Sequence, residues 1–241
     1  MSLGMFMPID LRAESFWDAD FPNGFGGAAQ ANNDAIASFT DNGTKGNTLT
    51  QATGANKPTY KTAIVNGHNV MRFVRASSQF LSVASSAANN YVGSMTLFSL
   101  NAIASEPIGV SYAALSVDNG VGFGGWKIGT FNDASMNQIV FTTYGQADYP
   151  SGVNDYSALD TFLVESSNFV DNSSAEIYKN GALEFTGGAS TMGSSGTQPL
   201  RMSGTELWDG DIHSVIWFWR ALDRWEMNLV HQFLLNKIAL T

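Results

Sequence analysis

The chain has 241 residues and a mass of 25.9 kDa, with 44% hydrophobic and 12% aromatic residues, so it can bury a large core and a disordered chain is excluded. Charged residues make up only 14%, against about 25% in an average soluble domain, which predicts a neutral polar surface. The chain has 12 basic and 21 acidic residues, and its net charge of −9 argues against nucleic acid and anionic membranes as partners. The absence of Cys excludes disulfides, thiolate zinc sites and cysteine nucleophiles.

The N-terminus lacks the pattern of an export signal. It carries no basic stretch and reaches Pro8 and Asp10 before an apolar run of about 7–15 residues can develop. The most apolar stretch, residues 215–219, is far shorter than the roughly 20 residues of a membrane-spanning helix. We therefore expect neither a signal peptide nor a spanning helix.

Short runs of β-branched and aromatic residues, separated by Gly, Asn, Asp and Ser, recur along the chain and predict an antiparallel all-β fold. Within residues 94–103, Met95, Leu97 and Ser99 follow the two-residue period of a strand with one face buried. Further strands are predicted at residues 71–75, 139–143 and 161–165.

Two Asn-Gly pairs predict tight hairpins. Asn180-Gly181 lies between the strand-like residues 176–179 and 182–185, and Asn66-Gly67 precedes residues 68–73. A two-residue turn of type I′ needs positive φ at both central positions, which Asn and Gly tolerate.

A single helix is predicted at the C-terminus. Asp223 is a suitable N-cap, and Glu226 is placed to complete a capping box. The expected apolar stripe runs through Trp225, Leu229, Phe233 and Lys237 at a spacing of four residues, widened by Val230 and Leu234. Trp217, Trp219 and Trp225 are assigned to core packing.

The six Pro residues are scattered, and no linker divides the chain. We expect one domain over residues 16–241, preceded by residues 1–15 as an N-terminal arm or first strand. Met5, Phe6 and Met7 are apolar and adaptable, so this arm is the predicted anchoring segment.

Several segments in order resemble the laminin-G-like jelly roll of the concanavalin A-like lectin and glucanase superfamily, as found in bacteriophage and bacterial proteins. They are residues 17–20, 39–43, 56–60, 65–73, 78–81, 175–181 and 208–223. The resemblance implies a two-sheet antiparallel jelly-roll sandwich with one C-terminal helix. It implies no single activity, because such domains serve as sugar binders, adhesion modules, virion parts and enzymes.

Catalytic motifs are missing from the sequence. A β-glucan hydrolase of this superfamily is expected to carry a Glu-x-Asp-x-x-Glu strand, which does not occur here. Asp209 and Asp211 lie on one side of an extended chain, but a role in the turn before the last strand is favoured. His68, His213 and His231 are far apart in sequence and form no zinc motif. We expect no enzymatic activity and no cofactor.

Calcium is the one candidate metal. Asp118, Asn119 and Asp133 offer the oxygen ligands that Ca²⁺ prefers, although Asp-Asn and Asn-Asp pairs usually form ordinary turns.

Sugar binding needs aromatic faces together with side chains that bond to hydroxyl groups. The candidates are Trp126, Tyr144, Asp148, Tyr149, Tyr156 and Trp208. Residues 144–156 are the most suggestive segment, because they contain three Tyr; a loop packed by its own tyrosines, or against another subunit, gives the same pattern.

Domains of this kind normally act outside cells, yet no export signal is expected. This favours a non-catalytic bacteriophage structural protein on the exterior of the virion, as a decoration, spike or tail-fibre module. It would contact capsid or tail proteins, form a homo-oligomer such as a trimer, and touch host glycans only weakly. The alternative is a carbohydrate-binding module of a secreted or surface-bound bacterial protein, and a glycoside hydrolase or lyase comes third.

Overall fold

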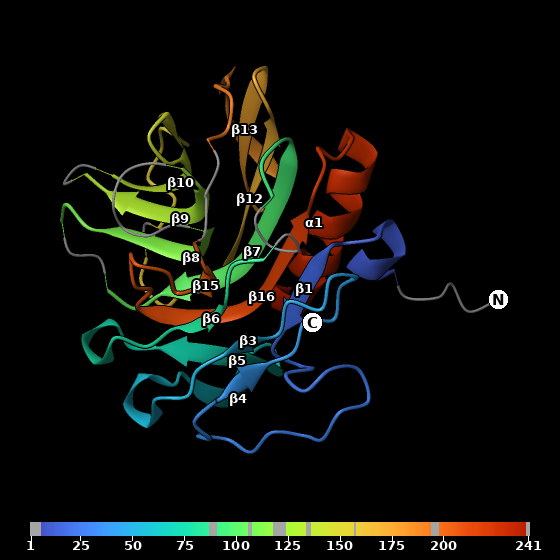
Figure 1. Ribbon diagram of the computed structural model, residues 1–241, viewed down its shortest axis with the longest axis vertical. Helices are drawn as coiled ribbons and strands as arrows, with labels where there is room; N and C mark the ends of the chain where they lie inside the picture. Colours follow the sequence, from blue (N-terminus) through green and yellow to red (C-terminus); the bar gives the residue numbers. More distant parts are fainter. Residues whose placement is uncertain are drawn as a thin grey trace.

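The computed structural model describes residues 6–86, 91–105, 108–117, 124–133, 136–156, 158–193 and 198–239. Within these ranges, two antiparallel sheets of eight strands face one another, and one α-helix lies outside them (Figure 1). This confirms the predicted two-sheet sandwich with a C-terminal helix. No helix in these ranges is long and apolar enough to cross a bilayer.

The first sheet, called sheet 1, has the order β14-β13-β12-β7-β16-β5-β4, and β1 pairs with β16 outside this order. Its strands are β1 (Ser15–Asp18), β4 (Thr59–Val65), β5 (His68–Phe73), β7 (Met95–Ile103), β12 (Leu163–Val170), β13 (Ser174–Lys179), β14 (Ala182–Gly188) and β16 (Gly210–Phe218). Strands β7 and β16 are buried at every position, because both of their faces are covered.

The second sheet, called sheet 2, has the order β11-β10-β9-β8-β15-β6-β3-β2. Its strands are β2 (Ser38–Phe39), β3 (Leu49–Thr50), β6 (Leu81–Val83), β8 (Ser111–Val117), β9 (Trp126–Asn132), β10 (Asn137–Thr143), β11 (Ala147–Pro150) and β15 (Leu200–Met202). Strand β11 forms one edge of this sheet and pairs only with β10 among the described strands.

Alternation along β7 divides the interior into two apolar clusters. Met95 and Leu97 point between the sheets, where they join the main core. Phe98 and Leu100 point to the opposite face, where they join a second cluster that packs under the helix. The predicted alternation of residues 94–103 is confirmed, and the second cluster explains why the intervening residues are apolar too.

Both predicted hairpins are present. Asn180 and Gly181 have φ of 50° and 81° and join β13 to β14, while Asn66 and Gly67 have φ of 46° and 83° and join β4 to β5. Positive φ at both positions is what a type I′ turn requires.

Helix α1 (Arg224–Ile238) begins with the predicted capping box, in which Asp223 accepts a hydrogen bond from the backbone N–H of Glu226. The predicted apolar stripe is right in part: Val230, Leu234 and Lys237 are buried as expected, whereas Leu229 and Phe233 are half-buried and Trp225 is exposed. The buried residues are Met227, Val230, His231, Leu234 and Lys237. Trp225 is 65% exposed, because the buried face of the helix runs through Met227, Val230 and Leu234.

The N-terminal segment packs on the helix. A short 3₁₀-helix, η1 (Pro8–Leu11), follows Phe6 and Met7, and these two side chains lie against the cluster under α1. The ring of Phe6 lies 6.4 Å from that of Phe233. Phe6 and Met7 are thus half-buried within their own domain, while Met5 lies outside the described residues.

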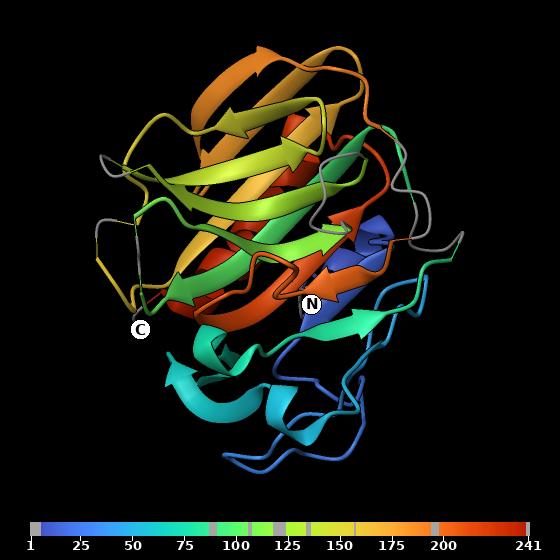
Figure 2. The same ribbon diagram turned by 60° about the vertical axis from the view of Figure 1, so that its left-hand side comes forward.

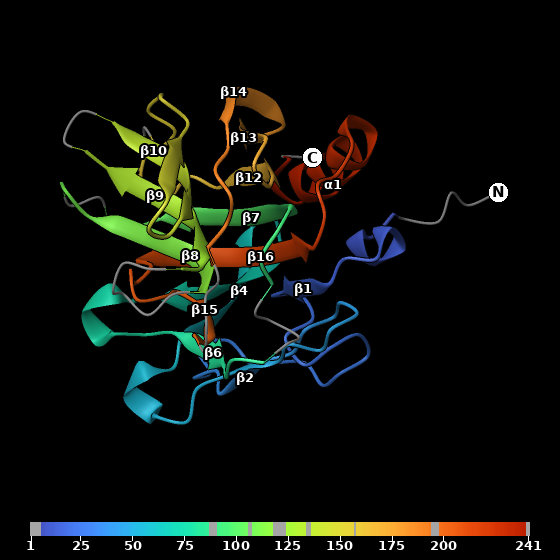
Figure 3. The ribbon, with the colours of Figure 1, turned by 45° about the horizontal axis from the view of Figure 1, so that its top comes forward.

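The molecule is therefore layered: helix, sheet 1, sheet 2. Figure 2 shows the red helix behind both sheets, and Figure 3 shows α1 on the far side of β7 and β16 from β8, β9 and β10. The outer face of sheet 2 carries no helix in the described part of the chain.

Candidate functional site

The outer face of sheet 2 depends on the alternation of side chains along its strands. In β10, Ile139 and Phe141 enter the core, so Gln138, Val140 and Thr142 line the opposite face. Neighbouring strands of sheet 2 also have polar or small residues on this side. Together they form a surface with exposed hydrogen-bonding groups.

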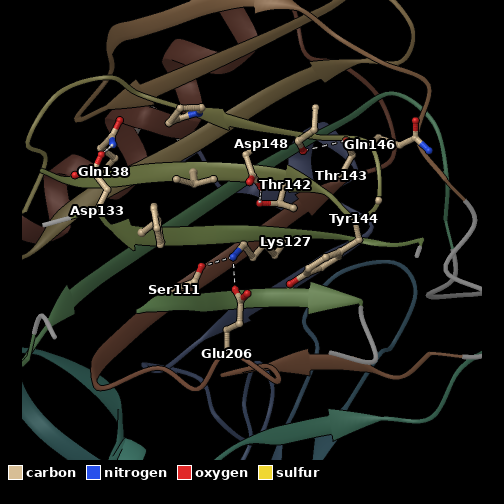
Figure 4. Close-up of a pocket in the computed structure, with 15 residues that line it drawn as sticks. Ser111, Lys127, Asp133, Gln138, Thr142, Thr143, Tyr144, Gln146, Asp148 and Glu206 are labelled. Carbon is tan, nitrogen blue, oxygen red and sulfur yellow. Dashed lines mark hydrogen bonds and ion pairs between the residues drawn. The ribbon is translucent and has the colours of Figure 1, made fainter. Parts of the chain in front are cut away.

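These outward residues form a groove of about 670 Å³ over β8, β9, β10 and β11 (Figure 4). Glu206, from the segment between β15 and β16, closes one side. Small-molecule sites usually have volumes of about 300–1,000 Å³, so the groove is large enough for a small saccharide.

Lys127 lies in the floor of the groove. Its side chain comes from β9 and is only 5% exposed. Its ammonium group donates to Ser111 Oγ and forms an ion pair with Glu206, as Figure 4 shows. Because a buried lysine needs a partner, this pair fixes both the lysine and the segment that carries Glu206.

Tyr144 and Phe131 supply half-buried aromatic surface to the groove. Tyr144 follows the end of β10, and Figure 4 shows its ring directed across the groove toward Glu206. The ammonium nitrogen of Lys127 lies 6.0 Å from the centre of this ring. A tyrosine held in this way offers a flat apolar face next to polar groups.

Hydrogen-bonding side chains lie along the edge of the groove. The hydroxyl of Thr142 donates to Oδ1 of the exposed Asp148 over 2.6 Å. The side-chain amide of Gln138 donates to Oδ2 of Asp133 over 3.3 Å, and its carbonyl oxygen accepts from the backbone of Gly152 over 3.0 Å. Carboxylate and amide groups with fixed orientations are suited to bonding hydroxyl groups.

The structure brings together only two of the six residues that the sequence suggests for sugar binding. Tyr144 and Asp148 both line the groove. The other four are buried in the core, so a sugar cannot reach their rings and their assignment is corrected: Trp126, Tyr149, Tyr156 and Trp208.

Each of these four has a packing role instead. The ring of Trp126 lies 4.7 Å from that of Trp217, and Tyr112 meets Trp208 edge to face at 6.3 Å. The hydroxyl of Tyr149 accepts a hydrogen bond from the backbone of Ser190. Residues 144–156 are thus largely packed by their own tyrosines, which was the alternative interpretation of that segment.

Sequence reasoning missed much of the groove. Lys127, Phe131 and Thr142 lie on strands, and Glu206 comes from a distant segment. The alternation of polar and apolar residues in 137–143 was the available signal, because it predicts one solvent-facing side for that strand.

The candidate calcium ligands are not seen together. Asp133 lies at the rim of the groove, and its Oδ1 accepts from the backbone of Met136 in a local turn. Asp118 and Asn119 lie outside the described residues. Calcium binding therefore stays a prediction.

A second polar cluster brings together residues from near the start of the chain, from β5 and β16, and from the end of α1. Oδ2 of Asp20, one ring nitrogen of His68 and one of His213 lie within 4.8 Å of one another. The ammonium of Lys237 lies 2.9 Å from Asp20 and 3.1 Å from Asp18, so it balances both carboxylates. Burial opposes ionisation of Asp20, but the hydrogen bond from His213 and the neighbouring positive charges outweigh it and lower its pKa.

A third cluster is sealed between the sheets. Glu165 is fully buried, and its Oε2 lies 2.9 Å from the hydroxyl of Tyr156, which also lies 2.8 Å from Oδ1 of Asn101. Burial raises the pKa of Glu165 to about 8. No ligand can reach this cluster without opening the sandwich, so it belongs to the core.

No protein-family model matches the sequence, and a search of curated proteins finds no match. Solved structures are similar in fold. They include the binding domain of Paraclostridial Mosquitocidal Protein 1 (TM-score 0.61, 13% identity, 83% of this chain and 50% of that chain). Another is the botulinum neurotoxin serotype D binding domain (TM-score 0.58, 8% identity, 94% of this chain and 52% of that chain). A third is Trypanosoma rangeli sialidase in complex with sialic acid (TM-score 0.53, 14% identity, 94% of this chain and 33% of that chain).

This chain spans about half the length of the two binding domains and a third of the sialidase. Sequence identities of 8–14% establish the fold and leave the ligand open. The similarity shows a shared two-sheet β-sandwich fold.

Proposed function

We propose that the protein is a non-catalytic carbohydrate-binding β-sandwich that holds a glycan in the groove on the outer face of sheet 2. The observation that carries the proposal is the half-buried ring of Tyr144, which lines a groove of about 670 Å³ together with fixed polar side chains. Two of the similar structures are binding domains and the third is a sialidase with bound sialic acid, and a binding role is in keeping with them.

The groove provides both kinds of contact that a sugar needs. The apolar face of a pyranose ring packs on the face of Tyr144, and Phe131 extends the apolar wall. Asp148, Gln138 and the exposed Gln146 lie where they can bond to hydroxyl groups of the ligand. The buried pair of Lys127 and Glu206 keeps the floor in place and needs little rearrangement on binding.

Binding without hydrolysis is part of the proposal. Most glycoside hydrolases use two carboxyl groups that flank the bond that is cleaved. Three carboxylates line the groove, and each has a partner. Glu206 pairs with Lys127, Asp148 on the edge strand β11 accepts from Thr142, and Asp133 accepts from Gln138 and from the backbone of Met136, so all three stabilise the walls of the groove. Incubation with bound oligosaccharides should release no reducing sugar, and release of it would show an enzyme instead.

The virion role stays a prediction. Neither the described residues nor the similar structures favour a capsid or tail partner over a glycan, so the carbohydrate-binding alternative becomes the preferred function. A homo-oligomer, capsid or tail contacts, and a location on the virion or outside the cell are predictions that follow from the sequence alone.

Replacing Tyr144 by Ala tests the proposed function. Loss of the ring face should weaken binding to whichever glycan the wild-type protein selects on an array by about tenfold, which corresponds to about 1.4 kcal/mol. Binding is then measured by titration calorimetry, and the melting temperature checks that the variant is folded.

Trp225→Ala is the matched control, because Trp225 is an exposed aromatic residue on α1, across the molecule from the groove. It should bind glycan as the wild type does. Equal binding by the wild type and Tyr144→Ala, or a wild type that binds no glycan, would contradict the proposal.

A further inference from the structure

We infer that the groove selects glycans without acidic groups, and that it discriminates against sialylated, uronic and sulfated sugars. This rests on the proposed function, since it concerns the ligand of the same groove. The inference is carried by the charges along the groove and by the state of its one cation.

Acidic residues dominate the lining. Asp133, Asp148 and Glu206 line the groove, and Lys127 is the one basic residue among the described residues that do so. The lining therefore has a formal charge of −2. An anionic sugar placed there lies close to like charges, and solvent only partly screens the repulsion between them.

The one cation is already engaged. Lys127 donates to Ser111 Oγ and pairs with Glu206, and its side chain is only 5% exposed. Its ammonium has one further N–H donor, but a sugar carboxylate would have to share the single positive charge with Glu206 or displace it, and Glu206, which is 31% exposed, would then lose its partner. Separating a largely buried pair carries a high cost, so Lys127 acts as part of the floor and does not serve as an anion site.

Recognition of carboxylate or sulfate commonly depends on the planar fork of an arginine. None of the described residues that line the groove is Arg. The one cation, Lys127, has a single ammonium group, and two of its three donors already point to Ser111 and Glu206. The groove thus lacks the donor set that an acidic sugar requires.

The polar groups present fit neutral sugars instead. Thr142 donates to Oδ1 of Asp148, which leaves the second oxygen of this exposed carboxylate to accept from a sugar hydroxyl. A hydroxyl-rich neutral glycan donates such bonds, and an amino sugar donates them with a complementary charge. The net charge of −9 over the whole chain adds long-range repulsion of anions at low salt.

The experiment compares matched glycans that differ only in charge. The probes are lactose and 3′-sialyllactose for a galactoside ligand, or the neutral and sialylated or sulfated forms of whichever core the array identifies. The wild-type protein should bind the neutral form at least tenfold more tightly than the acidic form. This ratio should shrink as salt is raised from low to physiological concentration.

Charge reversal at the edge strand provides the decisive variant. Asp148→Lys should raise affinity for the acidic form and reduce the ratio to about threefold or less. Asp148→Asn should have a smaller effect in the same direction and guards against misfolding of the reversed variant. Asp10→Lys makes the same change in net charge on the exposed η1 segment, across the molecule, and should leave the ratio unchanged.

The two proposals fail in different ways. If the wild type binds no glycan, or if Tyr144→Ala binds as well as the wild type, the proposed function is wrong. If binding depends on Tyr144 but the acidic form binds as tightly as the neutral form, the proposed function stands and the charge selection is overturned. An unchanged ratio in Asp148→Lys would overturn it as well.

Discussion

The carboxyl group of Glu165 lies between the two sheets with the hydroxyl of Tyr156 at 2.9 Å. The same hydroxyl lies 2.8 Å from the amide oxygen of Asn101, which can only accept. A phenol has one proton to donate, so a protonated Glu165 completes both hydrogen bonds. This geometry agrees with the raised pKa of about 8, and it predicts that the folded protein holds a proton on Glu165 that the unfolded chain releases.

Between pH 4.5 and 8 the folded state should therefore bind more protons than the unfolded state at Glu165, so this residue makes stability fall as pH rises. His231, whose pKa burial lowers to about 4, acts in the opposite direction up to pH 6.5. Glu165→Gln keeps a neutral hydrogen-bonding group and removes the proton. As pH rises from 5 to 8, the melting temperature of the wild type should fall relative to that of Glu165→Gln. Parallel profiles would contradict the assignment.

Residue types could be read from the sequence, but for most of the candidate sugar-binding residues the face to which the side chain points was not predicted. Neighbouring residues of a strand point to opposite faces, and therefore Asp148 lines the groove while Tyr149 enters the core. Trp126 and Lys127 differ in the same way, with the tryptophan inside and the lysine in the groove floor. Counting the aromatic residues of a segment therefore overestimated the number of sugar-binding residues, because large aromatic rings stabilise the fold most when they are buried in the core.

Among the elements, those defined by local signals were predicted well. The two Asn-Gly hairpins and the capping box of α1 each depend on a few adjacent residues, and all three are present. The rotation of α1 depends instead on how it packs on β7, β12 and β16, which no local pattern specifies. The helix pattern placed Trp225 in the core, whereas Met227 takes that position.

This corrected helix face gives a test at the same scale. Met227→Ala removes a side chain that is 2% exposed in the cluster under α1 and should lower the free energy of unfolding by about 2–4 kcal/mol. Trp225→Ala removes a larger side chain that is mostly exposed and should change it by less than about 1 kcal/mol. Urea denaturation measures both, and a larger loss for Trp225→Ala would restore the original stripe.

On the scale of the whole molecule, the class of fold followed from composition and from the order of strand and turn signals. The groove could not be predicted, because it combines β8 to β11 with Glu206, which the chain reaches only after three strands of sheet 1 and β15. Pairing across such distances is set by the closure of the sandwich rather than by any local signal.

The two outer faces of the sandwich differ, and this bears on assembly. Helix α1 covers sheet 1, while the groove occupies the open face of sheet 2. If the groove binds glycans, the homo-oligomer predicted from the sequence should form through contacts that leave the groove accessible. Light scattering with and without saturating glycan should return one assembly mass in both cases, above the 25.9 kDa of a single chain. A mass of 25.9 kDa would contradict the oligomer.

The packing of Phe6 on Phe233, and the hydrogen bond from Asn66 to the backbone oxygen of Ala239, hold both described ends of the chain on the helix side of the molecule. Figure 1 shows α1 on the other side of β7 and β16 from β8, β9 and β10, whose outer face carries the groove. A carrier, or a surface on which the protein is immobilised, that is attached close to Phe6 or Ala239 therefore lies behind the sandwich. Copies displayed in this way present their grooves outward, and an array of them would bind a glycan-coated surface with the gain in avidity that multiple contacts give.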